Sequence, residues 1–425
     1  MNTEIPIKTN SRPILIGYLP PLAGFEKTKD NYLLHSSYIN IGDISYTYPA
    51  TLLCAGKNFE PWDWAMSAEE VNERFSQVIF SLPCRISAPP HDEDGFPFER
   101  ITQFISKLTI PFVNISESIQ SSDYEYASDF ASRLRPNVIR YLHTVADHSN
   151  IVGTRGEYSA DILRKIGISN VEPIGCPSLY INGPSLHPNL TSKKHFNEIE
   201  RISVCYSNYQ HLSHSKIKDI LKLACDNDYH YVEQSFNLIV KALYYPEMIE
   251  AQDIHNANIF YHGLDEIQTL FEQQRVHYFT NYQVWKQFLS NMDFVFGARM
   301  HGITPAIHAG VPSLFIAHDA RVREMCEFFQ LPFIAEKDLP SGNNLTAEYL
   351  YSLSKYEQAA KTYKYRYKNF INFLEKNDIT PNIDQNSEII NLWEPKPSVG
   401  VQHSETYKPD RLDGKAFRHL CKKLT

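Results

Sequence analysis

The sequence has no long apolar run and no paired cysteines. Its 425 residues include seven cysteines, which are scattered without a CxxC pair. No stretch reaches the roughly eighteen consecutive apolar residues of a transmembrane helix. The N-terminal segment MNTEIPIKTNSRP is polar and lacks the apolar core of a secretory signal. Scattered cysteines without such a signal indicate reduced thiols, so we expect a cytoplasmic protein.

Several kinds of functional site are also missing. The net charge of −8 argues against nonspecific nucleic-acid binding. The sequence contains no P-loop, GxGxxG fingerprint, nucleophile elbow or HExxH motif. The acidic run from His91 to Asp94 lies between prolines and glycine and has no partner at ligand spacing, so we interpret it as a solvated loop. We therefore expect no metal and no bound cofactor.

What is present favours two α/β domains. A chain of this length exceeds one ordinary core. Short apolar runs alternate with amphipathic helical runs on both sides of a polar, turn-rich stretch at 182–197. This alternation predicts two doubly wound domains with parallel sheets. The predicted segments are an N-terminal domain at 1–185, a C-terminal domain at 198–340, and a long helix with a basic tail at 346–425.

The stretch from Asp293 to Asp319 predicts a strand, a short helix and a second strand. Such a unit is βαβ, so its strands should be parallel. The turn after the first strand carries Arg299 and His301. Ligands of open parallel sheets bind at the carboxyl ends of strands, and a helix N-terminus there favours anions. The pair therefore suits an anionic substrate that needs proton transfer, although an Arg–His hydrogen-bond network is an equal alternative.

Two further turns carry candidate residues. Asn40 and Asp43 flank a glycine turn ahead of a predicted helix, where Asp43 could face a substrate or simply cap the helix. Arg155 directly follows the predicted strand at 150–153 and precedes Glu157. It repeats the strand, charged turn and helix pattern of Arg299. Its alternative role is a surface ion pair with Glu157.

Together these segments resemble the polysaccharide pyruvyl transferase family. The resemblance rests on three motifs in the family's order, namely Asn40-Ile41-Gly42-Asp43, then Thr154 to Ser159 with Ile174 to Ser178, and finally Gly297, Arg299, His301, Ala306, Gly310, Pro312 and Asp319. They extend from about residue 40 to 320. One departure is Arg321, with Arg323 after it, where the family commonly has lysine. Arginine keeps the charge but changes its geometry.

The resemblance implies a glycosyltransferase-B-like fold, with two Rossmann-like domains facing a cleft, and a pyruvyl transfer from phosphoenolpyruvate. The acceptor would be a sugar, oligosaccharide or lipid-linked glycan of a cell-surface polysaccharide, and the product a cyclic pyruvate ketal. Arg299, Arg155 and Arg321 would bind the donor's anionic groups, His301 would act as general acid, and Asp43 with Asn40 would serve the acceptor side. We expect His308 to be a packing residue.

Two alternative functions stay open at this point. One is a nucleotide-sugar glycosyltransferase of the same architecture, in which Glu324 would serve a ribose. The other is a non-catalytic sugar-binding protein. The tail from Asp413 to Thr425 combines basic and apolar residues. It predicts either peripheral contact with the inner membrane face or a frayed, solvated end.

Overall fold

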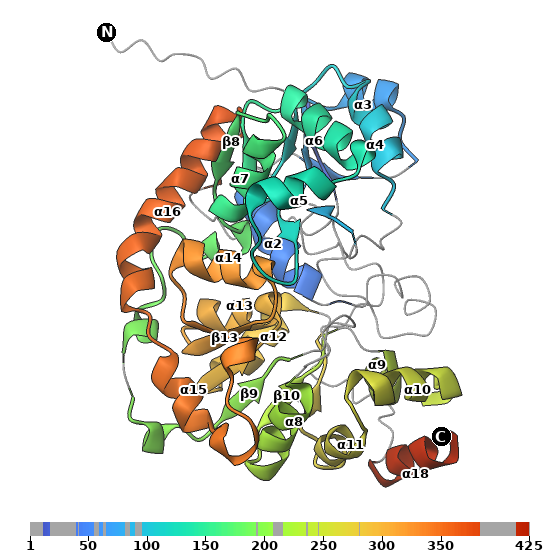
Figure 1. The fold of residues 1–425 in the computed structure, drawn as a ribbon, viewed down its shortest axis with the longest axis vertical. Helices are drawn as coiled ribbons and strands as arrows, with labels where there is room; N and C mark the ends of the chain where they lie inside the picture. Colours follow the sequence, from blue (N-terminus) through green and yellow to red (C-terminus); the bar gives the residue numbers. More distant parts are fainter. Residues whose placement is uncertain are drawn as a thin grey trace. The chain divides into compact units, whose positions relative to one another are not determined.

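The computed structural model describes residues 12–17, 40, 42–54, 59–62, 65–80, 86–89, 96–192, 194–206, 216–234, 237–244, 246–279, 281–382 and 414–424 (Figure 1). The predicted loops at 19–39 and 91–94 lie outside these residues. The chain divides into two compact units. Unit 1 comprises Met1–Leu19, Ala50–Pro177 and Lys368–Ile389, and unit 2 comprises Pro20–Pro49, Ser178–Tyr367 and Ile390–Thr425. The predicted boundaries near 185 and 198 remain a prediction.

Unit 1 is built on parallel strands. Its four-stranded sheet has the order β2-β1-β3-β5. Two separate two-stranded parallel sheets, β4-β6 and β7-β8, also belong to this unit. The strands are β1 (Ile14–Ile16), β2 (Phe59–Pro61), β3 (Gln77–Phe80), β4 (Ile86–Ser87), β5 (Phe112–Asn114), β6 (Ile119–Gln120), β7 (Val152–Thr154) and β8 (Val171–Pro173). The helices are α3 (Ala68–Arg74), α4 (Phe98–Ile105), α5 (Ala127–Arg133), α6 (Pro136–His148) and α7 (Glu157–Lys165).

Unit 2 contains a six-stranded parallel sheet in the order β11-β10-β9-β12-β13-β14. Its strands are β9 (Ile202–Val204), β10 (His230–Val232), β11 (Val276–His277), β12 (Phe294–Gly297), β13 (Ser313–Ala317) and β14 (Phe333–Ala335). Numbered within the unit, this is the 3-2-1-4-5-6 order of a doubly wound fold. The order reverses between β9 and β12, so the ligand-binding position of such a sheet lies at the carboxyl ends of these two strands.

The helices of unit 2 follow its strands, as a doubly wound sheet requires. They are α8 (Ile217–Asp226), α9 (Asn237–Tyr244), α10 (Ala251–Phe260), α11 (Asp265–Glu272), α12 (Tyr282–Ser290), α13 (Met300–His308), α14 (Ala320–Phe329), α15 (Ala347–Leu353) and α18 (Gly414–Leu424). Two more helices, α2 (Gly42–Cys54) and α16 (Glu357–Lys376), contribute residues to both units. The predicted α/β class with parallel sheets is confirmed.

The βαβ unit of the Asp293–Asp319 stretch forms as predicted. All residues of β12 and β13 are buried, which explains why their sequences are continuous apolar runs rather than alternating ones. The helix between them, α13, buries eight of its nine residues, so it is covered on nearly every side. It ends at Ala309, and Gly310 follows with a φ of 75°, the left-handed conformation that glycine adopts without strain.

Two predictions near the C-terminus are corrected. The single long helix predicted at 346–375 is two helices, α15 and α16, because the Ser354 hydroxyl bonds the Tyr351 carbonyl and Tyr356 docks its hydroxyl on the Ser313 carbonyl at 3.0 Å. The tail is a packed helix rather than a frayed end. In Figure 1, α18 lies beside α11, where Phe417 is fully buried at 4.4 Å between ring centroids from Phe271.

No helix within the described ranges combines the length and the apolar character needed to cross a membrane.

Candidate functional site

The turn that carries Arg299 and His301 lies at the point where the strand order of unit 2 reverses. Arg299 occupies the N-cap position of α13, and its backbone N–H donates to the Cys205 carbonyl at 3.3 Å, directly after β9. Gly297 has no room for a side chain here, because a Cβ atom would lie 1.8 Å from the Cys205 carbonyl oxygen. The turn is therefore pressed against the end of β9. The positive end of the α13 dipole faces this edge and favours an anion.

The start of α2 lies on the same turn. Asn40 accepts a hydrogen bond from the Gly42 N–H at 3.1 Å, so it is Asn40 that bonds the first helical residue. The Tyr46 and His301 rings lie 5.2 Å apart, and the Ser45 hydroxyl donates to the His301 carbonyl. Two segments that are about 260 residues apart in the sequence thus meet at one place. Their proximity is what a shared site requires.

The position of Asp43 corrects one alternative. Helix α2 begins at Gly42, so Asp43 belongs to its first turn and is not its N-cap. The capping role suggested by the sequence is therefore wrong, because a cap at Asp43 would place the first helical residue at 44, two residues after the observed start of the helix. The proposed role of Asp43 toward the acceptor stays a prediction.

A buried charged cluster follows the neighbouring strand β13. Asp319 caps α14 by accepting from the Val322 N–H at 2.9 Å, and Arg321 donates Nε to the same carboxylate at 2.8 Å. The Nε2 atom of His318 lies 3.4 Å from Asp319 Oδ2. Burial alone would raise the pKa of Asp319, but Arg321, His318 and the helical N–H lower it to about 2. Burial lowers the pKa of His318, which keeps this imidazole neutral at pH 7.

Beneath the turn lies a buried polar network that the sequence did not reveal. Gln234 follows β10, is 2% exposed, and donates its Nε2 to the Cys205 thiol at 2.7 Å. Glu233 is 1% exposed and accepts from the Tyr231 hydroxyl at 3.3 Å and from the Tyr261 hydroxyl. Burial raises the pKa of Cys205 to about 12, so this thiol stays protonated. The only signal in the sequence was that Glu233 ends the run at 229–233 that predicts a strand, with Gln234 directly after it.

Comparison with known proteins decides the family. The sequence model of the family described as polysaccharide pyruvyl transferase matches residues 92–320, which is more than half of the 425 residues. The chain belongs to the polysaccharide pyruvyl transferase family. A comparison with curated proteins finds no match.

Solved structures similar to this chain have low sequence identity to it. Anabaena HepE in complex with UDP and glucose is 9% identical, with a TM-score of 0.41 over 90% of this chain and 99% of that chain. The UDP-GlcNAc 2-epimerase of Methanocaldococcus jannaschii in complex with UDP-GlcNAc and UDP is 10% identical, with a TM-score of 0.38 over 89% and 98%. An uncharacterized protein of Klebsiella pneumoniae is 14% identical, with a TM-score of 0.34 over 73% and 99%.

Arg155 belongs to unit 1. It follows β7, is 2% exposed, and its Nε donates to the Ser116 hydroxyl at 3.4 Å. The surface ion pair with Glu157 is wrong, because Arg155 is buried and the exposed Glu157 pairs with Arg164. Ser116 has a φ of 69°, a left-handed conformation that costs a non-glycine residue about 1 kcal/mol or more. Such strain is frequent at functional sites.

Two residues that the sequence suggested for other roles lie in the interior. His308 is 2% exposed and hydrogen-bonds the Tyr282 hydroxyl, which confirms the predicted packing role, and burial lowers its pKa to about 3. Glu324, suggested for a ribose in the glycosyltransferase alternative, is 2% exposed inside α14. Neither side chain presents itself at the surface of the unit.

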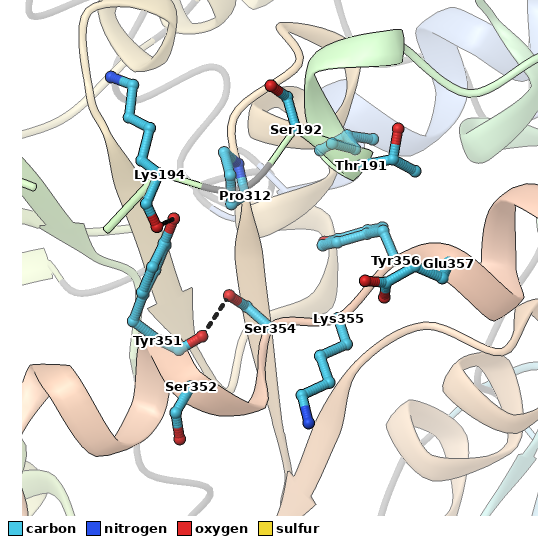
Figure 2. Close-up of a pocket in the computed structure, with 11 residues that line it drawn as sticks. Thr191, Ser192, Lys194, Pro312, Tyr351, Ser352, Ser354, Lys355, Tyr356 and Glu357 are labelled. Atoms are coloured by element: carbon cyan, nitrogen blue, oxygen red, sulfur yellow. Dashed lines mark hydrogen bonds between the residues drawn. The ribbon is translucent and has the colours of Figure 1, made fainter. Parts of the chain in front are cut away.

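A cavity of about 130 Å³ lies at the opposite edge of the sheet (Figure 2). Its lining includes Pro312, which directly precedes β13, and Tyr356, which bonds the first residue of that strand. Figure 2 shows the side chains of Lys194 and Lys355 extending away from Pro312 at its centre. Because ligands of doubly wound sheets bind at the carboxyl ends, we assign the site to the Arg299 turn and not to this cavity.

Proposed function

We propose that this protein transfers the pyruvyl group of phosphoenolpyruvate to a sugar of a cell-surface polysaccharide or its precursor, forming a cyclic pyruvate ketal. The observation that carries the proposal is the contact between the start of α2 and the Arg299–His301 turn, at the carboxyl edge where the strand order reverses. This contact supports the proposal because it brings two family motifs together, and the guanidinium of Arg299 is suited to anions while the imidazole of His301 is suited to proton transfer.

Arginine side chains would bind the donor. Phosphoenolpyruvate carries a carboxylate and a phosphate, and guanidinium groups match the geometry of both. Arg299 is half-buried at the N-terminus of α13 and is our first candidate for these groups. Arg155 of unit 1 is the second candidate. Arg321 already donates to Asp319, so we propose that it contributes to the site by holding that carboxylate in place.

His301 would supply the proton that starts the reaction. Its imidazolium donates a proton to the methylene carbon of phosphoenolpyruvate, and positive character develops at C2. An acceptor hydroxyl attacks C2 and loses its proton, after which phosphate leaves with the electron pair of the C2–O bond. A second hydroxyl of the same sugar then attacks C2 and loses its proton, which closes the ketal. General acid catalysis of this kind typically contributes about 10²- to 10⁴-fold.

The acceptor side is the less defined half. Asp43 would orient or deprotonate the attacking hydroxyl, and Asn40 would support the turn that presents it. We also propose a cytoplasmic reaction, which the free state of the six described cysteines supports. Any membrane contact through α18 would be electrostatic, through the exposed Lys415, Lys422 and Lys423, because Phe417 is buried against α11.

Donor binding and phosphate release test the proposal. Purified protein is titrated with phosphoenolpyruvate and with a panel of nucleotide sugars, and phosphate release is measured with glycan acceptors. We expect saturable phosphoenolpyruvate binding that Arg299→Ala abolishes, and a turnover that falls about 10²- to 10⁴-fold in His301→Ala. Arg323→Ala is the matched control, because Arg323 is more than a third exposed and pairs with Glu327 on α14. Binding of a nucleotide sugar alone would replace the proposal with glycosyl transfer.

A further inference from the structure

Helix α13 contains a proline where its His301 carbonyl needs a donor. In an α-helix the carbonyl of residue 301 accepts from the N–H of residue 305. Residue 305 is Pro305, which has no N–H and lies inside α13. The His301 carbonyl therefore needs a donor from outside the helix, because an unsatisfied carbonyl in the interior is costly.

Ser45 of α2 supplies this donor. Its side chain is fully buried, and its hydroxyl donates to the His301 carbonyl. The same hydroxyl lies 3.1 Å from the Gly42 carbonyl, one helical turn earlier. A serine has one hydroxyl proton. In a helix, the Gly42 carbonyl can accept from the backbone N–H of residue 46 and does not need the serine hydroxyl. The hydroxyl proton of Ser45 is therefore assigned to the His301 carbonyl.

The contact around this hydrogen bond has no spare volume. A Cβ atom on Gly42 would lie 3.4 Å from the Cβ of His301 and 2.9 Å from Oε1 of Gln234. A Cβ atom on Gly302 would lie 1.8 Å from Nε2 of the same glutamine. The amide of Gln234 thus fills the space between the first turns of α2 and α13. Both glycines permit this approach, and the two turns cannot shift independently.

We infer that Ser45 is a positioning residue, which holds the backbone of His301 against the first turn of α2 through the carbonyl that Pro305 leaves open. The inference rests on the proposed role of His301 as proton donor. Because α2 also carries Asp43, the same hydrogen bond sets the separation between the proposed proton donor and the proposed acceptor-side group. A displacement of about 1 Å between such groups can cost about 10²-fold in rate.

The test separates two effects of the Ser45 hydroxyl, namely its hydrogen bond to the His301 carbonyl and the link that this bond makes between α2 and α13. Ser45→Ala removes this hydroxyl donor and loosens the contact between the two helices. The double variant Ser45→Ala with Pro305→Ala restores a helical N–H for the carbonyl but not the link to α2. Pro305→Ala alone keeps the link and adds a second donor, which a carbonyl can accept. Thr304→Val is the matched control, because it removes a buried hydroxyl that donates to the Met300 carbonyl within α13.

Four variants and wild type are compared by steady-state phosphate release and by thermal unfolding. We expect kcat to fall about 10- to 100-fold in Ser45→Ala with KM for phosphoenolpyruvate nearly unchanged. The double variant should recover the unfolding temperature of Pro305→Ala but not kcat. Pro305→Ala and Thr304→Val should keep kcat within about threefold of wild type. Recovery of kcat in the double variant, or unchanged kcat in Ser45→Ala, would overturn the inference.

A readout without turnover keeps this inference separate from the proposed function. The His301 imidazole is followed by NMR in protein labelled at histidine nitrogen, assigned with His301→Gln. Ser45→Ala and the double variant should both change the chemical shifts of its ring nitrogens, while Thr304→Val should not. If wild type transfers no pyruvyl group, the proposed function fails while these spectra still decide the role of Ser45. Identical His301 signals in all variants would refute the inference.

Discussion

Replacing Arg321 with methionine tests whether this arginine binds substrate or stabilises a buried carboxylate. The sequence predicted a donor ligand, whereas the structure shows its Nε 2.8 Å from Asp319 and both side chains 9% exposed. Methionine keeps much of the side-chain volume and removes the charge. Asp319 then keeps only the Val322 N–H at 2.9 Å and His318 Nε2 at 3.4 Å as partners among these contacts.

The expected magnitude follows from the pKa of Asp319. In the wild type this pKa is lowered to about 2 from an ordinary value of 3.8, which corresponds to about 2.5 kcal/mol of stability at neutral pH. Without Arg321 the effect of burial dominates and raises the pKa above its ordinary value. The variant therefore loses the wild-type contribution and adds a penalty. Breaking a buried pair in this way costs about 3–5 kcal/mol.

The sign of the pH dependence distinguishes this cause from a simple packing defect. In the wild type, Asp319 has a lowered folded pKa, so its stabilisation is complete above about pH 4 and disappears as pH falls through 2. In the variant, the raised folded pKa makes the folded state lose stability as pH rises above about 4. The difference between the two proteins should thus be largest at pH 7 and shrink toward pH 4.

Urea unfolding at several pH values, with steady-state kinetics at pH 7, measures these quantities. The double variant Asp319→Asn with Arg321→Met should be more stable at pH 7 than Arg321→Met alone, because no unpaired charge remains in it. A stability loss below about 0.5 kcal/mol, together with a large rise in KM for phosphoenolpyruvate, would refute this reasoning. Arg321 would then be the donor ligand that the sequence suggested.

Two further predictions concern the interior of unit 2. Gly297→Ala should destabilise the protein by at least about 3 kcal/mol in urea unfolding. The new Cβ would lie 1.8 Å from the backbone oxygen of Cys205, which cannot move aside. A variant as stable as the wild type would contradict this close approach. His308→Gln should flatten the fall of stability on acidification. Burial lowers the folded pKa of His308 to about 3, so the unfolded chain binds the extra proton below about pH 6.5, and stability falls by up to about 1.4 kcal/mol per pH unit. An unchanged slope between pH 5 and 6.5 would contradict a neutral His308.

Much of the fold followed from local sequence patterns. Buried parallel strands such as β12 and β13 are continuous apolar runs bounded by glycine and proline, which makes them recognisable without tertiary information. The placement of Arg299 and His301 at a strand end followed from the same pattern. The break between α15 and α16 did not, because it depends on Tyr356 reaching the Ser313 carbonyl, a contact between residues 43 positions apart.

A position directly after a strand was not enough to predict a residue of the candidate site. Glu233 and Gln234 lie under the turn because β10 is the neighbour of β9 in the sheet, and strand order is not visible in a single sequence. His318 follows β13 but was not predicted as a site residue, because the family motif includes the neighbouring Asp319 and not His318. The helical tail was misjudged because its apolar face is covered by α11, which lies about 150 residues earlier.

Pro305 shows most clearly which features of the site a single sequence cannot predict. A proline inside a short helix is locally unfavourable, because it removes one hydrogen bond and leaves one carbonyl open. The donor that compensates, Ser45, is 256 positions away in the sequence. The carbonyl it satisfies belongs to the one histidine at the carboxyl edge that the family motif singles out. A local defect in α13 is thus the attachment point for a second helix. Local propensity predicts the defect, and only the fold shows its use.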